Sequence, residues 1–173
     1  MDKPDQISSD NTLPGLDDSL RVNPDVYNSI AKCAKLVGIQ LIESNFTISP
    51  AFFEKQGKTT PNVEVVNIHE AFDSSTKVAT SIFQLEVFFR QSRKKIFQQK
   101  DKFVVFYLID DECDEHHALA FARRTGLIAI YPYFRAHLAQ NAALANAKVP
   151  VLPTIASMPV KSKPIEPEET ADE

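Results

Sequence analysis

The sequence is poor in glycine, cysteine and tryptophan, and these shortages exclude several classes of protein. Its 4 glycines in 173 residues are too few for a glycine-rich loop that would hold phosphates. The two cysteines, Cys33 and Cys113, cannot form the disulfide framework of a small secreted domain and fit a reducing compartment. Tryptophan is absent, whereas phenylalanine occurs 12 times. The aromatic side chains are therefore mostly phenylalanine.

Long apolar runs are also missing. No segment approaches the 18 or so consecutive apolar residues of a membrane span, so membrane insertion is not expected. The first residues, MDKPDQISSDNTLPG, lack the basic and apolar regions of a signal peptide. We therefore expect a cytoplasmic protein.

The two ends of the chain differ from its middle in composition and charge. Residues 1–23 lack apolar periodicity and are rich in Asp, Ser, Asn and Pro, so they are predicted to be a disordered tail. Residues 159–173 are predicted to be a second disordered tail, which is acidic. The net charge of −4 comes from these ends, because residues 24–158 carry 15 bases and 13 acids. Residues 24–158 are expected to form one domain.

The periodicity of the middle predicts an α+β fold. Asn23-Pro24 is typical of a helix start, and apolar spacing predicts a helix over 24–37 that Gly38 ends. Four strands are then predicted, over 39–48, 62–72, 77–90 and 103–109. A long helix follows from the cap at Asp114 to about Ala147, and Pro132 should kink or restart it. The prolines after it predict an extended arm, so the whole order indicates an antiparallel sheet with helices on one side.

Several segments resemble the SecB family of protein-export chaperones. The sequences FTISP, NVEVV, KVATSIFQLEVFFR and KFVVFYLID are similar to the four strands of the family. GLIAIYPYFRAHLAQ at 126–140 is similar to its main helix, and VPVLPTIA at 149–156 to the loop that follows. The resemblance implies a four-stranded antiparallel sheet with a long kinked helix on one face. It also implies an ATP-independent chaperone without a cofactor that holds unfolded or precursor polypeptides and assembles as a dimer of dimers.

The sequence departs from that family at both ends and at the docking site for the SecA motor. Residues 159–173 have too little apolar content for the closing helix of the family, whereas the helix at 24–37 is extra. In the family, acidic residues on the first and fourth strands bind SecA. The matching positions here are Asn45, Ser49 and Phe106, which argues against coupling to that motor. Divergent members that serve toxin–antitoxin pairs are more similar to this chain.

Two sets of residues are candidates for a functional surface. A binder of unfolded chains needs exposed apolar side chains on a rigid frame. The first set would line a client-binding groove: Phe46, Ile48, Phe83, Leu85, Phe103, Val105, Leu152 and Ile155. The alternative is that these residues are buried in the core, as most aromatic residues of strands are. The second set lies on the main helix and would form the oligomer interface: Tyr131, Tyr133, Phe134, Arg135 and Leu138.

Two charged clusters suggest other functions. The acids, thiol and histidines of 110–117 are metal-ligand types, but their spacing matches no zinc pattern, and a solvated turn before a helix explains them. Six bases within 90–102 are compatible with nucleic-acid binding, but such a cluster more often protects a strand edge, and a third interpretation is attraction of acidic clients or a partner. Nucleic-acid binding is not expected, because the middle of the chain is only weakly positive. No nucleophile and base can be paired, so an enzyme is not expected. The main alternative to a chaperone is an adaptor for one partner, such as an antitoxin.

Overall fold

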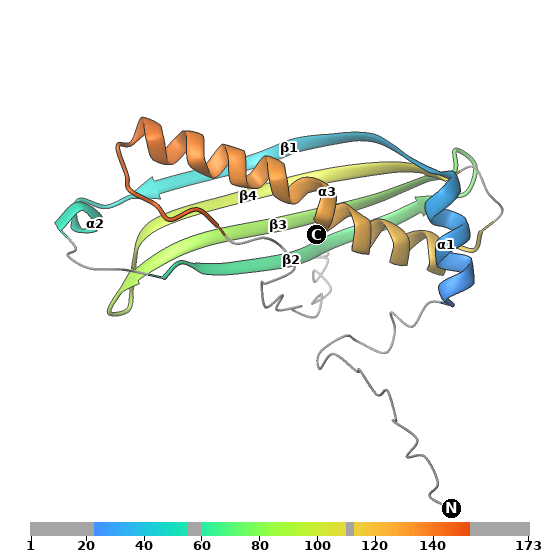
Figure 1. The fold of residues 1–173 in the computed structure, drawn as a ribbon, viewed down its shortest axis with the longest axis horizontal. Coiled ribbons are helices and arrows are strands. Elements are labelled where there is room, and N and C mark those ends of the chain that lie inside the picture. Colours follow the sequence, from blue (N-terminus) through green and yellow to red (C-terminus); the bar gives the residue numbers. More distant parts are fainter. Residues whose placement is uncertain (1–22, 55–59, 110–112, 153–173) are drawn as a thin grey trace, which may run out of the picture.

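The computed structural model describes residues 23–54, 60–109 and 113–152, and these form a sheet with helices on one face (Figure 1). The elements in chain order are α1 (Pro24–Cys33), β1 (Ala34–Ile48), α2 (Ala51–Glu54), β2 (Asn62–Asp73), β3 (Val78–Gln91), β4 (Lys94–Ile109) and α3 (Glu115–Leu144). The predicted α+β class, the four strands, the long helix and the additional N-terminal helix are confirmed. The predicted disordered tails lie outside the described residues, apart from Asn23.

The sheet is antiparallel throughout, with the order β1-β4-β3-β2. β3 and β4 form a hairpin in which Gln91 pairs with Lys94 across a two-residue turn, and Ser92 in that turn has a φ of 55°. β1 and β2 are the edge strands. β1 contains two register shifts, one between Leu36 and Gly38 and the other between Leu41 and Glu43. Such bulges leave extra residues outside the regular pairing of an edge strand.

Helix α3 covers one face of the sheet because its apolar residues recur every four positions. Ile130, Phe134, Leu138 and Ala142 are all buried, and they form one stripe along the helix. The close approach of helix and sheet depends on Gly126, since a Cβ there would lie 2.8 Å from side-chain atoms of Phe83 and of Val105. Pro132 lies inside α3 without ending it, so a second helix does not start there.

Helix α1 packs against the first part of α3. Asn23 caps α1 by accepting a hydrogen bond from the backbone nitrogen of Asp25 at 2.9 Å. Ile30 is buried, and the ring of Tyr27 lies 5.7 Å from that of Phe121 on α3. This contact fixes one end of the helical layer (Figure 1).

Two predicted boundaries were wrong because strand pairing overrides local pattern. The helix predicted over 24–37 ends at Cys33, since Ala34 pairs with Ile109 and residues 34–37 belong to β1. Gly38 therefore lies inside a strand and does not stop a helix. The strand predicted over 103–109 begins at Lys94, because the polar residues of 94–102 continue the hairpin with β3. None of the described helices is long and apolar enough to cross a membrane.

Candidate functional site

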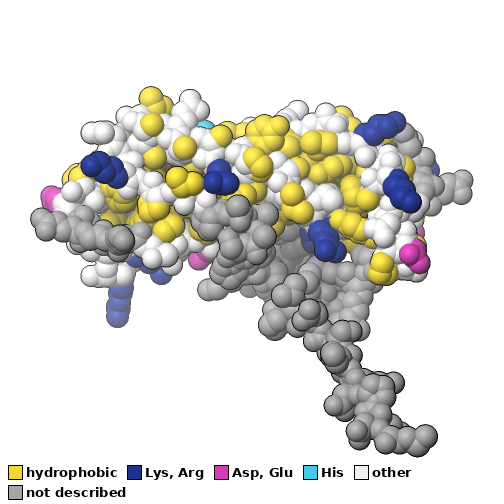
Figure 2. Space-filling model, viewed as in Figure 1, with side chains coloured by type: hydrophobic (Ala, Val, Ile, Leu, Met, Phe, Trp, Pro, Cys, Tyr) yellow, Lys and Arg dark blue, Asp and Glu magenta, His cyan; other side chains and the backbone are white. Residues whose placement is uncertain are grey.

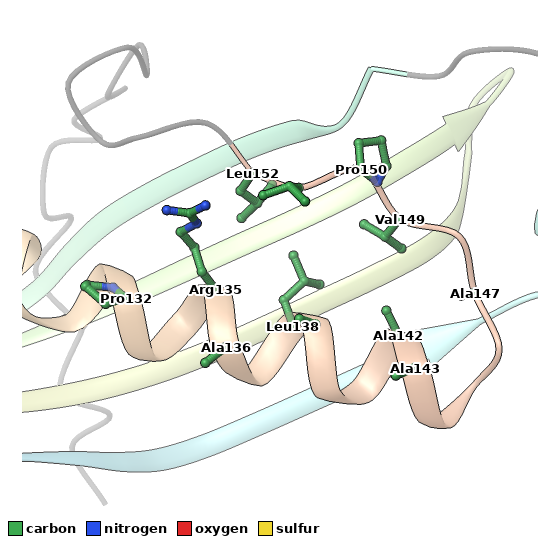
Figure 3. Close-up of a pocket in the computed structure, with 12 residues that line it drawn as sticks. Pro132, Arg135, Ala136, Leu138, Ala142, Ala143, Ala147, Val149, Pro150 and Leu152 are labelled. Carbon is green, nitrogen blue, oxygen red and sulfur yellow. The ribbon is translucent and has the colours of Figure 1, made fainter.

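The second half of α3 lies beside an apolar hollow, which we call the trough. Residues 147–152, the arm, turn back beside α3 and enclose a space of about 450 Å³ with it (Figure 3). This volume is within the range of about 300–1,000 Å³ that is typical of ligand sites. The lining is apolar except for one guanidinium: Pro132, Arg135, Ala136, Leu138, Ala139, Ala142, Ala143, Ala147, Val149, Pro150, Val151 and Leu152.

The arm is anchored at both ends and open between them. Asn146, with a φ of 52°, follows the end of the helix, and the backbone nitrogen of Ala147 donates to the carbonyl of Ala142 at 2.8 Å. Leu152 is buried at the far end, whereas Val151 keeps 83% of its surface exposed. The arm therefore exposes apolar side chains to solvent while both of its ends are held by contacts with the rest of the chain.

A second apolar hollow, the β1 cleft, lies on the other side of α3. Its volume is about 300 Å³, and its lining residues come from β1, β4 and α3: Ile39, Leu41, Phe103, Tyr133, Ala136, His137 and Gln140. Leu41 is 43% exposed and Tyr133 is 57% exposed, so the cleft has an open apolar rim. Figure 2 shows hydrophobic side chains across this face of the molecule. Ala136 lines both hollows. It belongs to the exposed ridge of this half of α3, which comprises Pro132, Tyr133, Ala136, Ala139, Gln140, Ala143 and Leu144.

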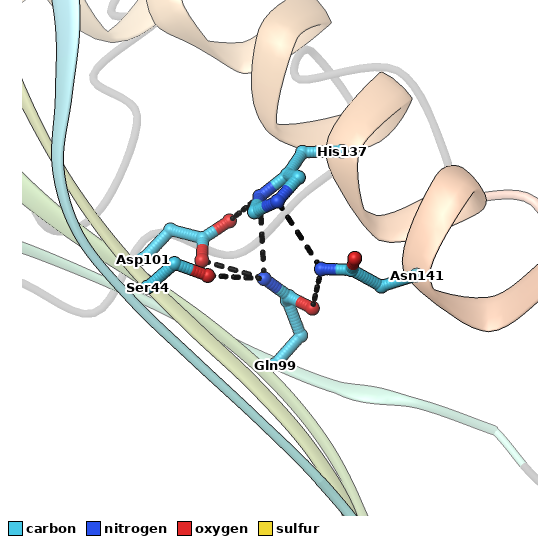
Figure 4. Close-up of polar contacts among 5 residues, drawn as sticks. All are labelled: Ser44, Gln99, Asp101, His137 and Asn141. Carbon is cyan, nitrogen blue, oxygen red and sulfur yellow. Dashed lines mark hydrogen bonds and ion pairs between the residues drawn. The ribbon is translucent and has the colours of Figure 1, made fainter. Parts of the chain in front are cut away.

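A hydrogen-bonded network holds this half of α3 on the sheet (Figure 4). The carboxylate of Asp101 on β4 is fully buried, and His137 Nδ1 lies 2.9 Å from its Oδ2. Gln99 Nε2 donates to Asp101 Oδ1 at 2.5 Å, and Asn141 Nδ2 donates to Gln99 Oε1 at 2.9 Å. The network also reaches β1, since Gln99 Nε2 lies 3.4 Å from Ser44 Oγ. These bonds satisfy polar groups that would otherwise be costly to bury.

A second polar contact holds the first half of α3. The guanidinium of Arg123 binds both carboxylate oxygens of Glu70 on β2, and its Nε lies 2.7 Å from Glu70 Oε2. Asn67 Nδ2 donates to the same carboxylate at 2.9 Å. A bidentate pair of this kind fixes the orientation as well as the distance of its partners. The helix that carries both hollows is thus fixed at two places along its length.

The only charged side chain among the lining residues of the trough is Arg135. Its Cζ lies 5.9 Å from the ring centroid of Tyr131, which packs against the core. Burial raises the pKa of the Tyr131 phenol, and the charge of Arg135 opposes that rise. The phenol therefore stays neutral near pH 7, and the trough carries a single positive charge at its side.

The sequence-predicted groove is mostly core. Phe83, Leu85, Phe103 and Val105 are at most 3% exposed beneath α3, so in the described chain they lie in the core, which was the alternative to an open groove. Phe103 does form part of the lining of the β1 cleft. The remaining members lie at other places: Phe46 and Ile48 are half-buried, Leu152 lines the trough, and Ile155 is outside the described residues.

The residues predicted for an oligomer interface divide between two sides of α3. Tyr131, Phe134 and Leu138 are at most 3% exposed against the chain's own core, so they are not available to another subunit. Tyr133 is exposed and Arg135 is half-buried. The exposed alanines of α3 were not among the residues predicted from the sequence. Their signal was the Ala-rich stretch after residue 135, which indicated a helix without indicating which side was open.

The acidic cluster before the main helix has a structural role. Asp114 caps α3, because its Oδ1 accepts from the backbone nitrogen of His117 at 2.9 Å, and this bond holds the pKa of Asp114 below its usual range. In the parts of the chain that the structure describes, no three His, Cys, Asp or Glu side chains could hold a metal together. Asp110, Asp111 and Glu112 fall outside those parts.

Comparisons with known proteins identify the fold. No family model matches the sequence, and no curated protein matches it. A solved structure is similar: the SecB-like chaperone Rv1957 of Mycobacterium tuberculosis, in complex with a ChAD peptide from the Rv1956 HigA1 antitoxin. The match has a TM-score of 0.60 at 18% identity and covers 79% of this chain and 99% of that one. The chain therefore has the fold of a SecB-like chaperone.

Proposed function

We propose that this protein is a SecB-like chaperone of the cytoplasm that binds unfolded or precursor polypeptides without nucleotide hydrolysis. The observation that carries the proposal is the pair of apolar hollows beside the exposed ridge of α3. Apolar surface that a folded chain leaves open on a rigid frame is suited to binding the apolar segments of other chains.

The physical basis of this binding is burial of apolar side chains in the trough and the β1 cleft. Burial contributes roughly 25 cal/mol for each Å² of apolar surface removed from water. The alanines of the lining leave room for large client side chains, and Arg135 can attract a carboxylate beside them. One segment in one hollow would bind weakly. A client that occupies several hollows of an oligomer at once would bind much more tightly.

The first test measures aggregation of an unfolded client by light scattering, without ATP. We expect the wild-type chain to suppress aggregation. Because Ala139→Asp with Ala143→Asp should weaken client binding about tenfold or more, the double variant should need a correspondingly higher concentration for the same suppression. Both alanines are exposed in the trough, and a short carboxylate there must lose water when an apolar segment binds. The matched control is Ala31→Asp, at an exposed position of α1.

The two halves of this test have separate meanings. A wild-type chain that leaves scattering unchanged would contradict the chaperone function itself. Full suppression by the double aspartate variant would retain the function but contradict the trough as its site. Comparable unfolding midpoints for the variants and the control would show that folding is not the cause of a difference, because all three positions are at the surface.

We further propose that copies of the chain associate through β1 and the ridge of α3, up to a dimer of dimers. β1 is a 15-residue edge strand, and its exposed large apolar residues include Leu36, Val37, Leu41 and Ile42. A long apolar edge of this kind readily pairs with another strand. Tyr133 and Ile128, each more than half exposed, extend the apolar surface onto α3.

Ile42→Lys is expected to lower the molar mass in solution, as measured by sedimentation or light scattering. Ile42 is 52% exposed at a register shift of β1, so a lysine fits the folded chain but puts a charge into the proposed interface. Ala71→Lys, at an exposed position of the opposite edge strand β2, is the control and should leave the mass unchanged. An unchanged mass for both variants would contradict association through β1.

An adaptor for one specific partner is the second candidate. The similar structure holds a peptide from an antitoxin, which favours a dedicated partner over a broad set of clients. Pull-down from cell lysate distinguishes the two, because a chaperone of precursors captures many proteins and an adaptor captures one. Docking to SecA is not part of the proposal, since Asn45, Ser49 and Phe106 offer no acidic site.

A further inference from the structure

The β3–β4 hairpin carries a basic surface that binding of apolar segments does not explain. We call this surface the hairpin patch, and it comprises Arg90, Arg93, Lys94, Lys95, Lys100 and Lys102. Lys100 and Lys102 alternate with the buried Gln99, Asp101 and Phe103, so they lie on the face of the sheet opposite α3. Figure 2 shows basic side chains projecting at the lower left, where Figure 1 places the turn between β3 and β4.

Carboxylates on the same face offset only part of this charge. Glu86 binds Lys95, and Glu43 binds Lys102. A hydrogen bond from Lys102 and the nearby charge of Lys100 hold the pKa of Glu43 below its usual range. Glu64 on β2 is the backbone pairing partner of Glu86 on β3. The face around the hairpin patch therefore carries three acids, Glu43, Glu64 and Glu86, against six bases. The hairpin patch is therefore net positive, and its most exposed charges are at the turn.

The patch is also held in a defined position. The ring of Phe88 is 2% exposed, with Arg90 Cζ at 4.7 Å and Lys95 Nζ at 4.4 Å from its centroid. Gln98 Nε2 donates to Glu86 Oε1 at 2.9 Å, which fixes the carboxylate that binds Lys95. The cations beside Phe88 are thus placed by cation–π contacts and by a hydrogen-bonded acid. A surface built in this way differs from a set of loose surface lysines.

The same sequence contains a segment of complementary charge. Residues 166–173, EPEETADE, carry five acids and no base. Residues 1–22 also carry five acids, but these are spread over a longer segment that contains Lys3 and Arg21. Of the two ends of the sequence, residues 166–173 therefore have the higher density of negative charge. We propose that this acidic segment binds the hairpin patch of its own chain and shields it from other polyanions.

The chain is long enough for this contact. The 14 residue-to-residue steps from Leu152 to residue 166 span up to about 50 Å when extended. β4, with 16 residues, is about 50 Å long at 3.3 Å per residue, so the acidic segment reaches either end of the sheet. A tethered segment also has an effective concentration of about millimolar order, which favours it over an untethered competitor. Nucleic acid is the weaker candidate, because outside the patch the described residues carry no excess of positive charge.

Zero-length carbodiimide cross-linking of the full chain tests the contact. At low salt we expect amide cross-links from Lys94 or Lys95 to Glu168, Glu169 or Asp172, and these should disappear at high salt. Mixing isotopically labelled and unlabelled chains separates links within one copy from links between copies. Arg93→Gln with Lys94→Gln should reduce the remaining link to Lys95 several-fold. The control, Lys32→Gln with Lys148→Gln, removes two exposed bases elsewhere and should change nothing.

Shielding is tested with a single-stranded oligonucleotide as the competing polyanion. In the full chain, neutralisation of the five acids (E166Q, E168Q, E169Q, D172N and E173Q) is expected to raise oligonucleotide affinity about tenfold at low salt. The difference should vanish at high salt, where both contacts are screened. Missing cross-links, or cross-links only between copies, would overturn the intramolecular contact. Equal oligonucleotide affinity before and after neutralisation would overturn the shielding.

Discussion

Replacing His137 with alanine is expected to lower the free energy of unfolding by about 3 kcal/mol. The side chain of His137 keeps 24% of its surface exposed, whereas its partner Asp101 has none. Removal of the imidazole therefore leaves a buried carboxylate with Gln99 as its remaining side-chain partner. The cost of breaking such a pair comes mainly from the charge that is left behind. His69→Ala, at an exposed position of β2, is the control and should change stability by less than about 0.5 kcal/mol.

The bonds around His137 also indicate which ring nitrogen carries the hydrogen. Asp101 accepts at Nδ1, so Nδ1 carries the proton, and Asn141 Nδ2 then donates to Nε2 at 3.2 Å. Asp101→Asn would place an amide nitrogen or an uncharged oxygen opposite Nδ1. In the first case two donors meet, and in the second a charge-assisted bond becomes an ordinary one. We therefore expect Asp101→Asn to be destabilised by about 1–2 kcal/mol, less than His137→Ala.

Urea unfolding of the single and double variants separates this explanation from simple loss of packing. If the buried charge is the cause, Asp101→Ala should cost little more, or recover stability, once His137 is already alanine. Additive losses would mean that the two side chains act independently. A stability of His137→Ala equal to that of the wild type would contradict the network as drawn in Figure 4. Because the network holds the half of α3 that lines both hollows, client binding should weaken with stability.

The sequence predicted the number and type of the elements better than their ends. Alternation in KVATSIFQLEVFFR predicted a strand over 77–90, and β3 runs from Val78 to Gln91. The boundary between α1 and β1 was missed because Val37 fits the apolar spacing of a helix as well as it fits a strand. Pairing with β4 makes residues 34–37 part of a strand, and that pairing joins residues about seventy positions apart. Local periodicity carries no information on such distant partners.

The site was predicted less well than the fold, for a related reason. Alternation tells which strand residues share a face, but it does not tell which face a helix will cover. Phe83 and Phe103 were assigned to a groove, whereas α3 buries both. The part of α3 that stays open beside the arm includes Ala139 and Ala143, and alanines give a weak hydrophobic signal. Only the folded chain shows that the arm turns back beside them (Figure 3).

Gly126→Val is expected to lower the free energy of unfolding by about 3 kcal/mol or more, because it forces α3 away from the sheet. Even the first added carbon would lie 2.8 Å from Phe83 Cε2 and from Val105 Cγ1, and valine adds two further carbons. Gly126→Ala should cost less, about 1 kcal/mol, since alanine regains roughly 1 kcal/mol of helix propensity that glycine lacks. Urea unfolding followed by circular dichroism measures both variants.

The matched control is Gly38→Val, because a Cβ at Gly38 meets no atom within 4 Å and valine is favoured in strands. It should be as stable as the wild type or slightly more stable. If Gly126→Val does not fold, Gly126→Ala can be combined with Phe83→Leu, which removes the ring atoms nearest the new methyl group. The combined variant should then lose less than the sum of the two single changes. Full additivity, or a valine variant as stable as the wild type, would mean that α3 lies farther from the sheet than Gly126 now indicates.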